Sequence, residues 1–323
     1  MRIANTVPRT IPGLLLAAML LLVAMLLSCA CQAGATAGPD EAATSAPSSA
    51  SRTADREQAS GQSVGRQQAP GQPSGGHLVS GQSVELEPLY QPWERVLAAY
   101  VDDEGLVDYE GLSTRGRADL EEFMRGLAAA DPGGMPDEAA QIAFWINAYN
   151  ATVLWQIVEA YPLESVRDVG ALWGLVGGFF KQENPIAGEN RSLDDIEHGI
   201  LRANYADARI HWALVCGAFG CPRLLRRPYL AANLDTVLTA QAFEFVAEDR
   251  GLRLNREEDT LYLSRYFDWY AEDFEAESGS VIDYLLRYAS GDVADTLRSH
   301  RYGLTIQFMD YDWTLNDQAR GPR

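Results

Sequence analysis

Two cysteines and a histidine lie close together in one apolar stretch of the chain. His211, Cys216 and Cys221 fall within residues 208–222, and no other cysteine lies outside the N-terminal segment. A thiol becomes an effective nucleophile when a base lies within hydrogen-bond reach and a third group orients that base. This stretch is therefore the best candidate for thiol chemistry, with Cys216 as the nucleophile and His211 as the base.

The predicted backbone of this stretch limits which groups can pair. Residues 209–215 are apolar and β-branched or aromatic, which predicts a buried strand ending near Gly217. On one continuous strand, His211 and Cys216 would point to opposite faces because they are five residues apart. Either the strand ends before Cys216, or His198 is the base.

Cys221 is a rival nucleophile. It immediately precedes Pro222, where we predict that a helix begins. The N-terminus of a helix lowers the pKa of a nearby thiol.

The cysteine pair allows two further interpretations. In an oxidising compartment, Cys216 and Cys221 could form a disulfide that closes a small loop. Together with His198 and His211, they also have the donor types of a zinc or soft-metal site. Both alternatives stay open, and we assign no metal and no cofactor to the site.

A helix over residues 193–202, capped by Ser192, brings more polar groups. Glu197 is a candidate for orienting the base, and His198 is the alternative base. Asp194 and His198 are four residues apart, so they could instead pair on the helix surface.

A second helix is predicted over residues 138–161, and its apolar side chains occupy most of the circumference. Asn147 and Asn150 share one face of it. Buried amides need hydrogen-bond partners. The two asparagines either tie neighbouring loops to the helix or form a ligand-binding wall of the cleft, and we assign them to the wall.

The remaining pattern predicts a helix-rich α+β single domain with a small sheet. The expected elements are a helix over 90–101, an irregular loop of exposed aromatics over 164–190 that could cover a pocket, a helix over 229–247, a hairpin of 252–254 and 260–263, a helix over 265–274 capped by Ser264, helices over 280–297 broken near Gly291, and a strand over 304–308.

Charge excludes some partners. The chain has 45 acidic and 26 basic residues and a net charge of -19, so it would repel nucleic acid. Lys181 is the only lysine, and no glycine-rich phosphate loop precedes it, which argues against a P-loop nucleotidase.

The N-terminus predicts export. The apolar run 14–27 has the length of a secretory signal core, and it leads to Leu26-Leu27-Ser28-Cys29, which resembles a bacterial lipoprotein signal. This resemblance implies a signal peptide over 1–28, lipidation of Cys29 and a membrane-anchored protein of the cell envelope. Because residue 30 is not aspartate, it implies the outer membrane if the organism has one. An ordinary signal cut within 30–33 is the alternative.

Residues 29–84 are rich in Ala, Ser, Gly, Gln and Pro, with few large apolar side chains. Such a segment buries too little surface to offset its chain entropy, so we predict a disordered linker. The folded domain then spans residues 85–323.

Five motifs between residues 88 and 316 resemble the family called domain of unknown function 547. They are Phe144-Trp145-Ile146-Asn147-Ala148-Tyr149-Asn150, Ile196-Glu197-His198-Gly199-Ile200-Leu201-Arg202, His211-x-Ala213-Leu214-x-Cys216-x4-Cys221-Pro222, Trp269-Tyr270-x-x-Asp273-Phe274 and Tyr311-Asp312-Trp313-x-Leu315-Asn316. The resemblance implies a fold similar to papain-like or transglutaminase-like thiol enzymes. It also implies functional roles for Glu197, His198, His211 and Cys216, with Cys221 matching the second motif cysteine.

The resulting hypothesis is a lipid-anchored, extracytoplasmic domain with a cysteine-peptidase-like site. It would act on or bind a small peptide, an amide or a thiol compound. The competing hypothesis is a binding or scaffold module whose two cysteines are bonded to each other. The sequence indicates no oligomeric state.

Overall fold

The computed structural model describes residues 87–169, 178–300 and 302–321. The predicted signal peptide, Cys29 and the linker lie outside the described residues, as does the middle of the aromatic loop, 170–177.

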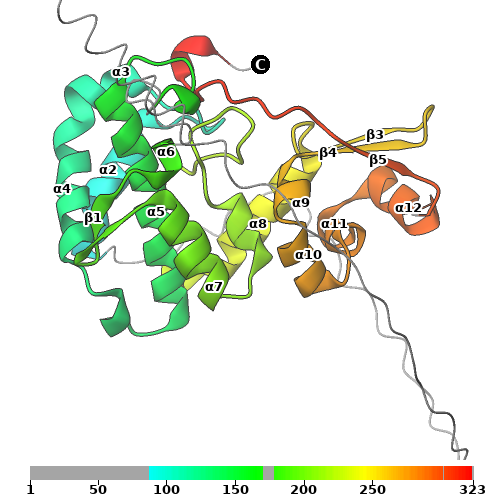
Figure 1. The fold of residues 1–323 in the computed structure, drawn as a ribbon, viewed down its shortest axis with the longest axis horizontal. Helices are drawn as coiled ribbons and strands as arrows, with labels where there is room; N and C mark the ends of the chain where they lie inside the picture. The colour runs from blue at the N-terminus through cyan, green and yellow to red at the C-terminus, as the bar shows by residue number, and fades with distance from the viewer. Residues whose placement is uncertain (1–86, 170–177, 301, 322–323) are drawn as a thin grey trace, which may run out of the picture. The chain divides into compact units, whose positions relative to one another are not determined.

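The long helix α5, Glu138–Ala160, is the centre of the N-terminal half (Figure 1). It begins at the side chain of Asp137, which accepts a hydrogen bond from the Ala140 N–H. From Ile142 to Val158 every residue except Trp155 is buried. The prediction of a helix enclosed on several sides is confirmed. Helices α2 (Gln91–Tyr100) and α4 (Arg117–Ala129) pack together, and α4 also contacts α5.

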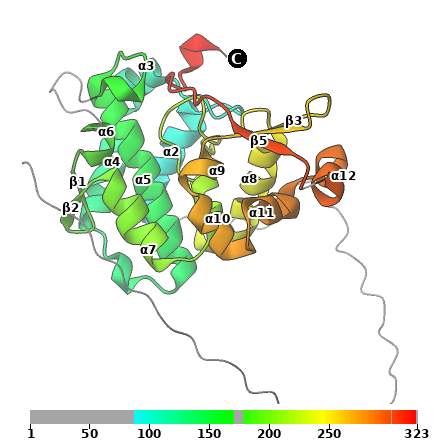
Figure 2. The ribbon, with the colours of Figure 1, turned by 45° about the vertical axis from the view of Figure 1, so that its right-hand side comes forward.

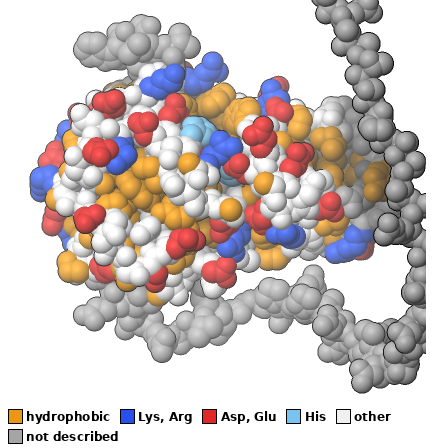
Figure 3. All heavy atoms as spheres, turned by 60° about the horizontal axis from the view of Figure 1, so that its bottom comes forward, with side chains coloured by type: hydrophobic (Ala, Val, Ile, Leu, Met, Phe, Trp, Pro, Cys, Tyr) orange, Lys and Arg blue, Asp and Glu red, His pale blue; other side chains and the backbone are white. Residues whose placement is uncertain are grey.

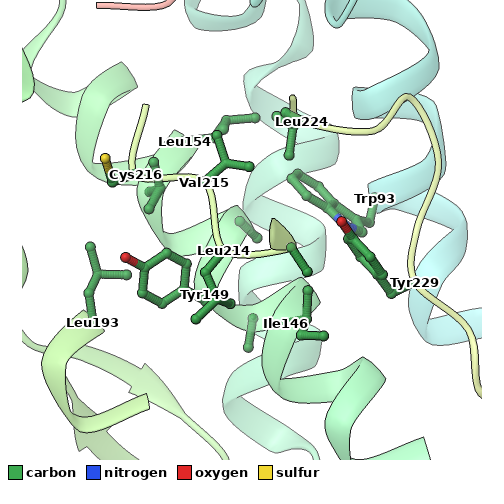
Figure 4. Close-up of a cluster of buried hydrophobic side chains, with 14 of the residues drawn as sticks. Trp93, Ile146, Tyr149, Leu154, Leu193, Leu214, Val215, Cys216, Leu224 and Tyr229 are labelled. Carbon is green, nitrogen blue, oxygen red and sulfur yellow. The ribbon is translucent and has the colours of Figure 1, made fainter. Parts of the chain in front are cut away.

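The cysteine stretch packs into the core that surrounds α5. Leu214, Val215 and Cys216 lie against Tyr149 and Leu154 of that helix, and Cys216 sits at the edge of the cluster (Figure 4). The stretch is therefore part of the core and not a surface loop.

A second hydrophobic cluster surrounds Trp212. Its ring stacks on those of Phe245 and Phe274, with ring centroids 4.5 Å and 5.4 Å apart. Its Nε1–H donates to the Tyr284 hydroxyl at 2.7 Å. These partners come from α8 (Leu234–Ala247), α10 (Ala271–Ser278) and α11 (Val281–Tyr288). Residues 208–216 thus contribute side chains to both clusters. In Figure 2, helices α5 and α7 lie on one side of the domain and helices α8 to α12 on the other.

Two small sheets complete the α+β fold. Strands β3 (Leu252–Asn255) and β4 (Thr260–Leu263) form the predicted hairpin, and β5 (Thr305–Phe308) adds parallel to β4, with Leu263 opposite Phe308. Strands β1 (Asn184–Ile186) and β2 (Glu189–Arg191) form a separate antiparallel pair. The predicted hairpin and C-terminal strand are confirmed.

The other helices are short. They are α3 (Tyr109–Gly111), α6 (Gly178–Lys181), α7 (Arg202–Asn204), α9 (Tyr266–Trp269) and α12 (Gly291–His300). Among the described residues, none of the helices has the length and apolar character to cross a membrane. On the face shown in Figure 3, acidic and basic side chains are interspersed with hydrophobic ones.

The predicted strand over 209–215 is wrong. Residues Ala208–Trp212 form a 3-10 helix, which begins where the Asp207 side chain accepts from the Arg209 N–H. The predicted helix after Pro222 is also absent, since residues 223–230 are described without a helix. The loop before Pro222 is held by the C-terminal segment. The N–H of Phe219 donates to Thr314 O at 2.7 Å, and that of Gly220 donates to Asp312 O at 2.9 Å.

Three smaller expectations also change. Phe179 is buried and not exposed, because it packs into the first core cluster. The helix predicted over 229–247 begins at Leu234. The helix predicted over 265–274 is interrupted at Tyr270, where α9 ends and α10 follows.

The two asparagines of α5 anchor loops and do not reach a pocket. The Asn147 Oδ1 accepts from Trp93 Nε1 and from the Tyr229 N–H, and its Nδ2 donates to Tyr229 O. Asn150 holds the cysteine stretch: its Nδ2 donates to Ala213 O at 2.9 Å, and its Oδ1 accepts from the Val215 N–H at 2.9 Å. These contacts match the loop-tying alternative and differ from the cleft wall that we assigned.

We predict that Asn150→Ala destabilises the domain by about 2 to 4 kcal/mol, because it leaves two buried backbone groups without partners. Urea denaturation would measure the loss. Asn204→Ala, at an exposed asparagine, is the matched control and should cost less than about 0.5 kcal/mol. A loss equal to that of the control would contradict the anchoring role of Asn150.

Candidate functional site

A pocket of about 370 Å³ collects most of the predicted site residues. Cys216, His211, Glu197 and His198 all line it, and they come from two segments of the chain, 195–201 and 208–216. The other lining residues are Tyr149, Phe180, Asp194, Leu214, Tyr266, Trp269, Tyr270, Tyr311 and Trp313. Cys221 is buried next to Cys216, whereas Asn147 and Asn150 lie away from the lining.

His211 is held by a carboxylate. Its Nε2 lies 2.7 Å from Asp273 Oδ2, and its ring stacks on Tyr270 at 3.9 Å. Because the carboxylate accepts, Nε2 carries the proton and Nδ1 keeps a free lone pair in the neutral ring. Nδ1 is buried and has no hydrogen-bond partner in the described part of the chain. His211 therefore has an unused basic nitrogen in the pocket that also contains Cys216.

Asp273 stays ionised because it has two cationic or polar partners. Arg202 binds it through two contacts, Nε to Oδ2 at 2.6 Å and Nη2 to Oδ1 at 2.9 Å. Burial raises the pKa of Asp273, but the hydrogen bonds from His211 and Arg202 outweigh it and hold this pKa well below its usual range. A permanently charged carboxylate can both orient His211 and stabilise its protonated form.

His198 occupies a different position. Its Nδ1 lies 2.9 Å from Arg202 Nη1. Since the guanidinium can only donate, Nδ1 of His198 is already used as an acceptor. No described hydrogen bond joins either histidine to a cysteine, so the partnerless Nδ1 of His211 is what makes it the candidate base.

Glu197 acts on His211 only through another side chain. It is buried and forms a hydrogen bond with the Tyr270 hydroxyl, and Tyr270 stacks on His211. The carboxylate in direct contact with the histidine is that of Asp273, to which the sequence analysis assigned no role. Its signal was present in the motif Trp269-Tyr270-x-x-Asp273-Phe274, which also supplies Trp269 and Tyr270 to the pocket.

The two cysteines form a hydrogen-bonded pair of free thiols. Their sulfur atoms are 2.7 Å apart, longer than the S–S bond of about 2.05 Å, and the described residues contain no disulfide. The Cys216 N–H donates to Cys221 Sγ at 3.1 Å. The Tyr311 hydroxyl lies 3.0 Å from Cys221 Sγ and 3.5 Å from Cys216 Sγ.

These contacts set the charges of the pair. Burial raises the pKa of Cys221, but hydrogen bonds from Cys216, Tyr311, the Ala218 backbone and Tyr266 lower it to about 7. The hydrogen bond to Cys221, together with burial, raises the pKa of Cys216. The negative charge of the pair therefore rests on Cys221, and Cys216 keeps its proton. The lowering at Cys221 agrees with the sequence analysis, but its cause is side-chain and backbone donors and not a helix N-terminus.

The metal alternative finds no support in the described segments. No group of three or more His, Cys, Asp or Glu side chains there is arranged to hold a metal ion. His211 and His198 each use one ring nitrogen for a side-chain partner, Asp273 and Arg202 respectively.

We predict that Tyr311→Phe raises the pKa of Cys221 by about one pH unit, because it removes one donor from a buried thiolate. A pH titration of the Cys221 13Cβ NMR signal, in protein labelled at cysteine, would measure it. Tyr302→Phe, at a 94% exposed tyrosine, should leave the titration unchanged. A Cys221 midpoint that stays near 7 in Tyr311→Phe would contradict the assigned hydrogen bond.

Comparison with known proteins supports the resemblance inferred from the motifs. Residues 133–246 match the model of a family described as "Protein of unknown function, DUF547". The matched segment includes α5, Glu197, His198, His211 and both cysteines, whereas Asp273 and Tyr311 lie beyond it. No curated protein and no solved structure matches the chain, so the papain-like resemblance gains no support from a known fold. Residues 133–246 are thus similar to a family whose description names no activity.

Proposed function

We propose that the pocket is a thiol-dependent acyl-transfer or hydrolase site in which Cys216 is the nucleophile, His211 the base and Asp273 the group that orients the base. One observation carries the proposal: the buried Nδ1 of His211 has no hydrogen-bond partner among the described residues, and His211 lines the same pocket as Cys216. Leaving such an atom unpaired costs about 1 to 3 kcal/mol, which a role in proton transfer would explain.

The reaction would begin with proton transfer. Because the pKa of Cys216 is raised, its thiol is protonated at neutral pH and needs a base. Nδ1 of His211 takes the proton, and the thiolate attacks the carbonyl carbon of the substrate. The imidazolium is stabilised by Asp273, 2.7 Å from Nε2. It then returns the proton to the leaving amine, alcohol or thiol as the tetrahedral intermediate collapses.

The resulting acyl-Cys216 would be released by a second nucleophile. Water, activated by His211 in the same way, gives hydrolysis, whereas an incoming amine or thiol gives acyl transfer. The pocket volume of about 370 Å³ suits a small ligand and supports a small peptide, an amide or a thiol compound as the substrate class. The net charge of -19 argues against a nucleic-acid partner.

A ligand-binding module without turnover is the second candidate. The observation that favours it is that Cys216, the thiol that lines the pocket, keeps its proton because its contact with Cys221 raises its pKa. A protonated thiol is a poor nucleophile. In that case the pocket would bind the same class of ligand without forming a covalent bond.

We also propose an extracytoplasmic location. The apolar run 14–27 followed by Cys29 supports cleavage and lipidation of that cysteine, with residues 29–84 as the tether between the membrane and the domain. The domain would then act in the cell envelope.

The test compares the two histidines of the pocket. With p-nitrophenyl acetate as a chromogenic ester, His211→Gln should slow acylation of Cys216 by about 100-fold or more, because a general base is lost. His198→Gln, at the other pocket histidine, should change the rate less than about threefold, since its Nδ1 is already bound by Arg202. Cys216→Ser should abolish acylation, and thermal melts would confirm that each variant is folded.

Two outcomes would refute the assignment. The first is a larger loss in His198→Gln than in His211→Gln. The second is ester cleavage that survives Cys216→Ser in the folded protein.

A further inference from the structure

Aromatic side chains supply more than half of the pocket lining. Trp269, Tyr311 and Trp313 form a continuous wall, with ring centroids 5.0 Å apart for Trp269 and Tyr311 and 4.6 Å apart for Tyr311 and Trp313. Trp269 is 43% exposed. Large rings left in contact with solvent in the pocket that contains Cys216 are available to a ligand, and the face of an indole ring attracts cations.

The charged side chains that line the pocket are acidic. Asp194 and Glu197 are among the lining residues, and no lysine or arginine is. Tyr270 engages Glu197, whereas the half-buried Asp194 precedes the helical turn Asp195–Leu201 without a side-chain capping hydrogen bond. Burial raises the pKa of Asp194 even though His198 and Lys181 act in the opposite direction. The negative charge of Asp194 is thus incompletely compensated by the protein.

The nearby cations have other partners or lie outside the lining. Arg202 binds Asp273 and His198. Arg167 is exposed and lies over the Trp313 ring, 5.6 Å from its centroid, and Lys181 is also exposed. Neither of these two lines the pocket. A cationic ligand would therefore meet an aromatic wall and the Asp194 carboxylate, whose charge partners are His198 and the exposed Lys181, with no lysine or arginine in the lining.

We propose that this pocket selects acyl or amide compounds that carry a primary ammonium group, held against Asp194 and the Trp269–Tyr311–Trp313 wall. A primary ammonium suits the site better than a quaternary one because its N–H groups can donate to the Asp194 carboxylate. The proposal rests on the proposed function for the position of the reacting carbonyl group. The ammonium preference itself can be measured without turnover.

A matched pair of small probes isolates the charge. Benzylamine, cationic at neutral pH, and benzyl alcohol have nearly the same shape, and quenching of tryptophan fluorescence or calorimetry measures their binding to the full chain. We expect benzylamine to bind roughly tenfold more tightly, from a cation–π contact together with a charged hydrogen bond. Equal affinities, or tighter binding of benzyl alcohol, would overturn the proposal.

Two variants assign the preference to its residues. Asp194→Asn keeps the shape of the side chain and should reduce the preference to about threefold or less, with benzyl alcohol binding unchanged. Glu189→Gln removes one charge from an exposed position outside the pocket and should keep the full preference. Trp313→Leu is the second pocket variant if Asp194→Asn fails to fold, and it should weaken benzylamine binding more than benzyl alcohol binding. A preference that survives both pocket variants would overturn the proposal.

The binding measurement and the acylation assay together distinguish this proposal from the proposed function. Ammonium preference without acylation of Cys216 by p-nitrophenyl acetate would remove the catalytic proposal and leave this one standing. Acylation of Cys216 without an ammonium preference would refute the ammonium proposal and leave the catalytic proposal standing.

Discussion

The chain of contacts from Arg202 through Asp273 to His211 is the constraint on which the site depends. It joins three segments, since Arg202 begins α7, Asp273 lies in α10 and His211 lies in the 3-10 helix Ala208–Trp212. Both charges of the Arg202–Asp273 pair are partly buried, so neither would tolerate loss of the other. This pair fixes the tautomer of His211 and leaves Nδ1 as the available nitrogen.

Packing brings these three segments to one place. Trp212, next to His211, stacks on Phe274, which follows Asp273. The aromatic cluster thus sets the distance between the histidine and its carboxylate. On the other side, Asn150 of α5 fixes the backbone at Ala213 and Val215, and so sets the position of Cys216. Cys216 belongs to the first hydrophobic cluster and Trp212, next to His211, to the second, and the two clusters meet along residues 208–216.

The sequence predicted those parts of the site that depend on local pattern. Helix α5, the β3–β4 hairpin and strand β5 follow from periodicity and turn residues, and residue chemistry identified His211, Cys216, Glu197 and His198 as neighbours of one pocket. Asp273 was missed because its contact with His211 spans 62 residues, a separation that no local pattern encodes. The strand predicted over 209–215 failed for a related reason. Apolar β-branched and aromatic residues suit a strand, but here they pack into the two hydrophobic clusters, and no strand among the described residues pairs with them.

The most direct test of the account is the tautomer of His211, measured by 15N NMR of histidine-labelled protein and assigned with His211→Gln. We predict that the neutral ring carries its proton on Nε2 and leaves Nδ1 bare, and that this preference is lost in Asp273→Asn. A proton on Nδ1 of the neutral ring, or a tautomer indifferent to Asp273, would show that His211 is not the base described.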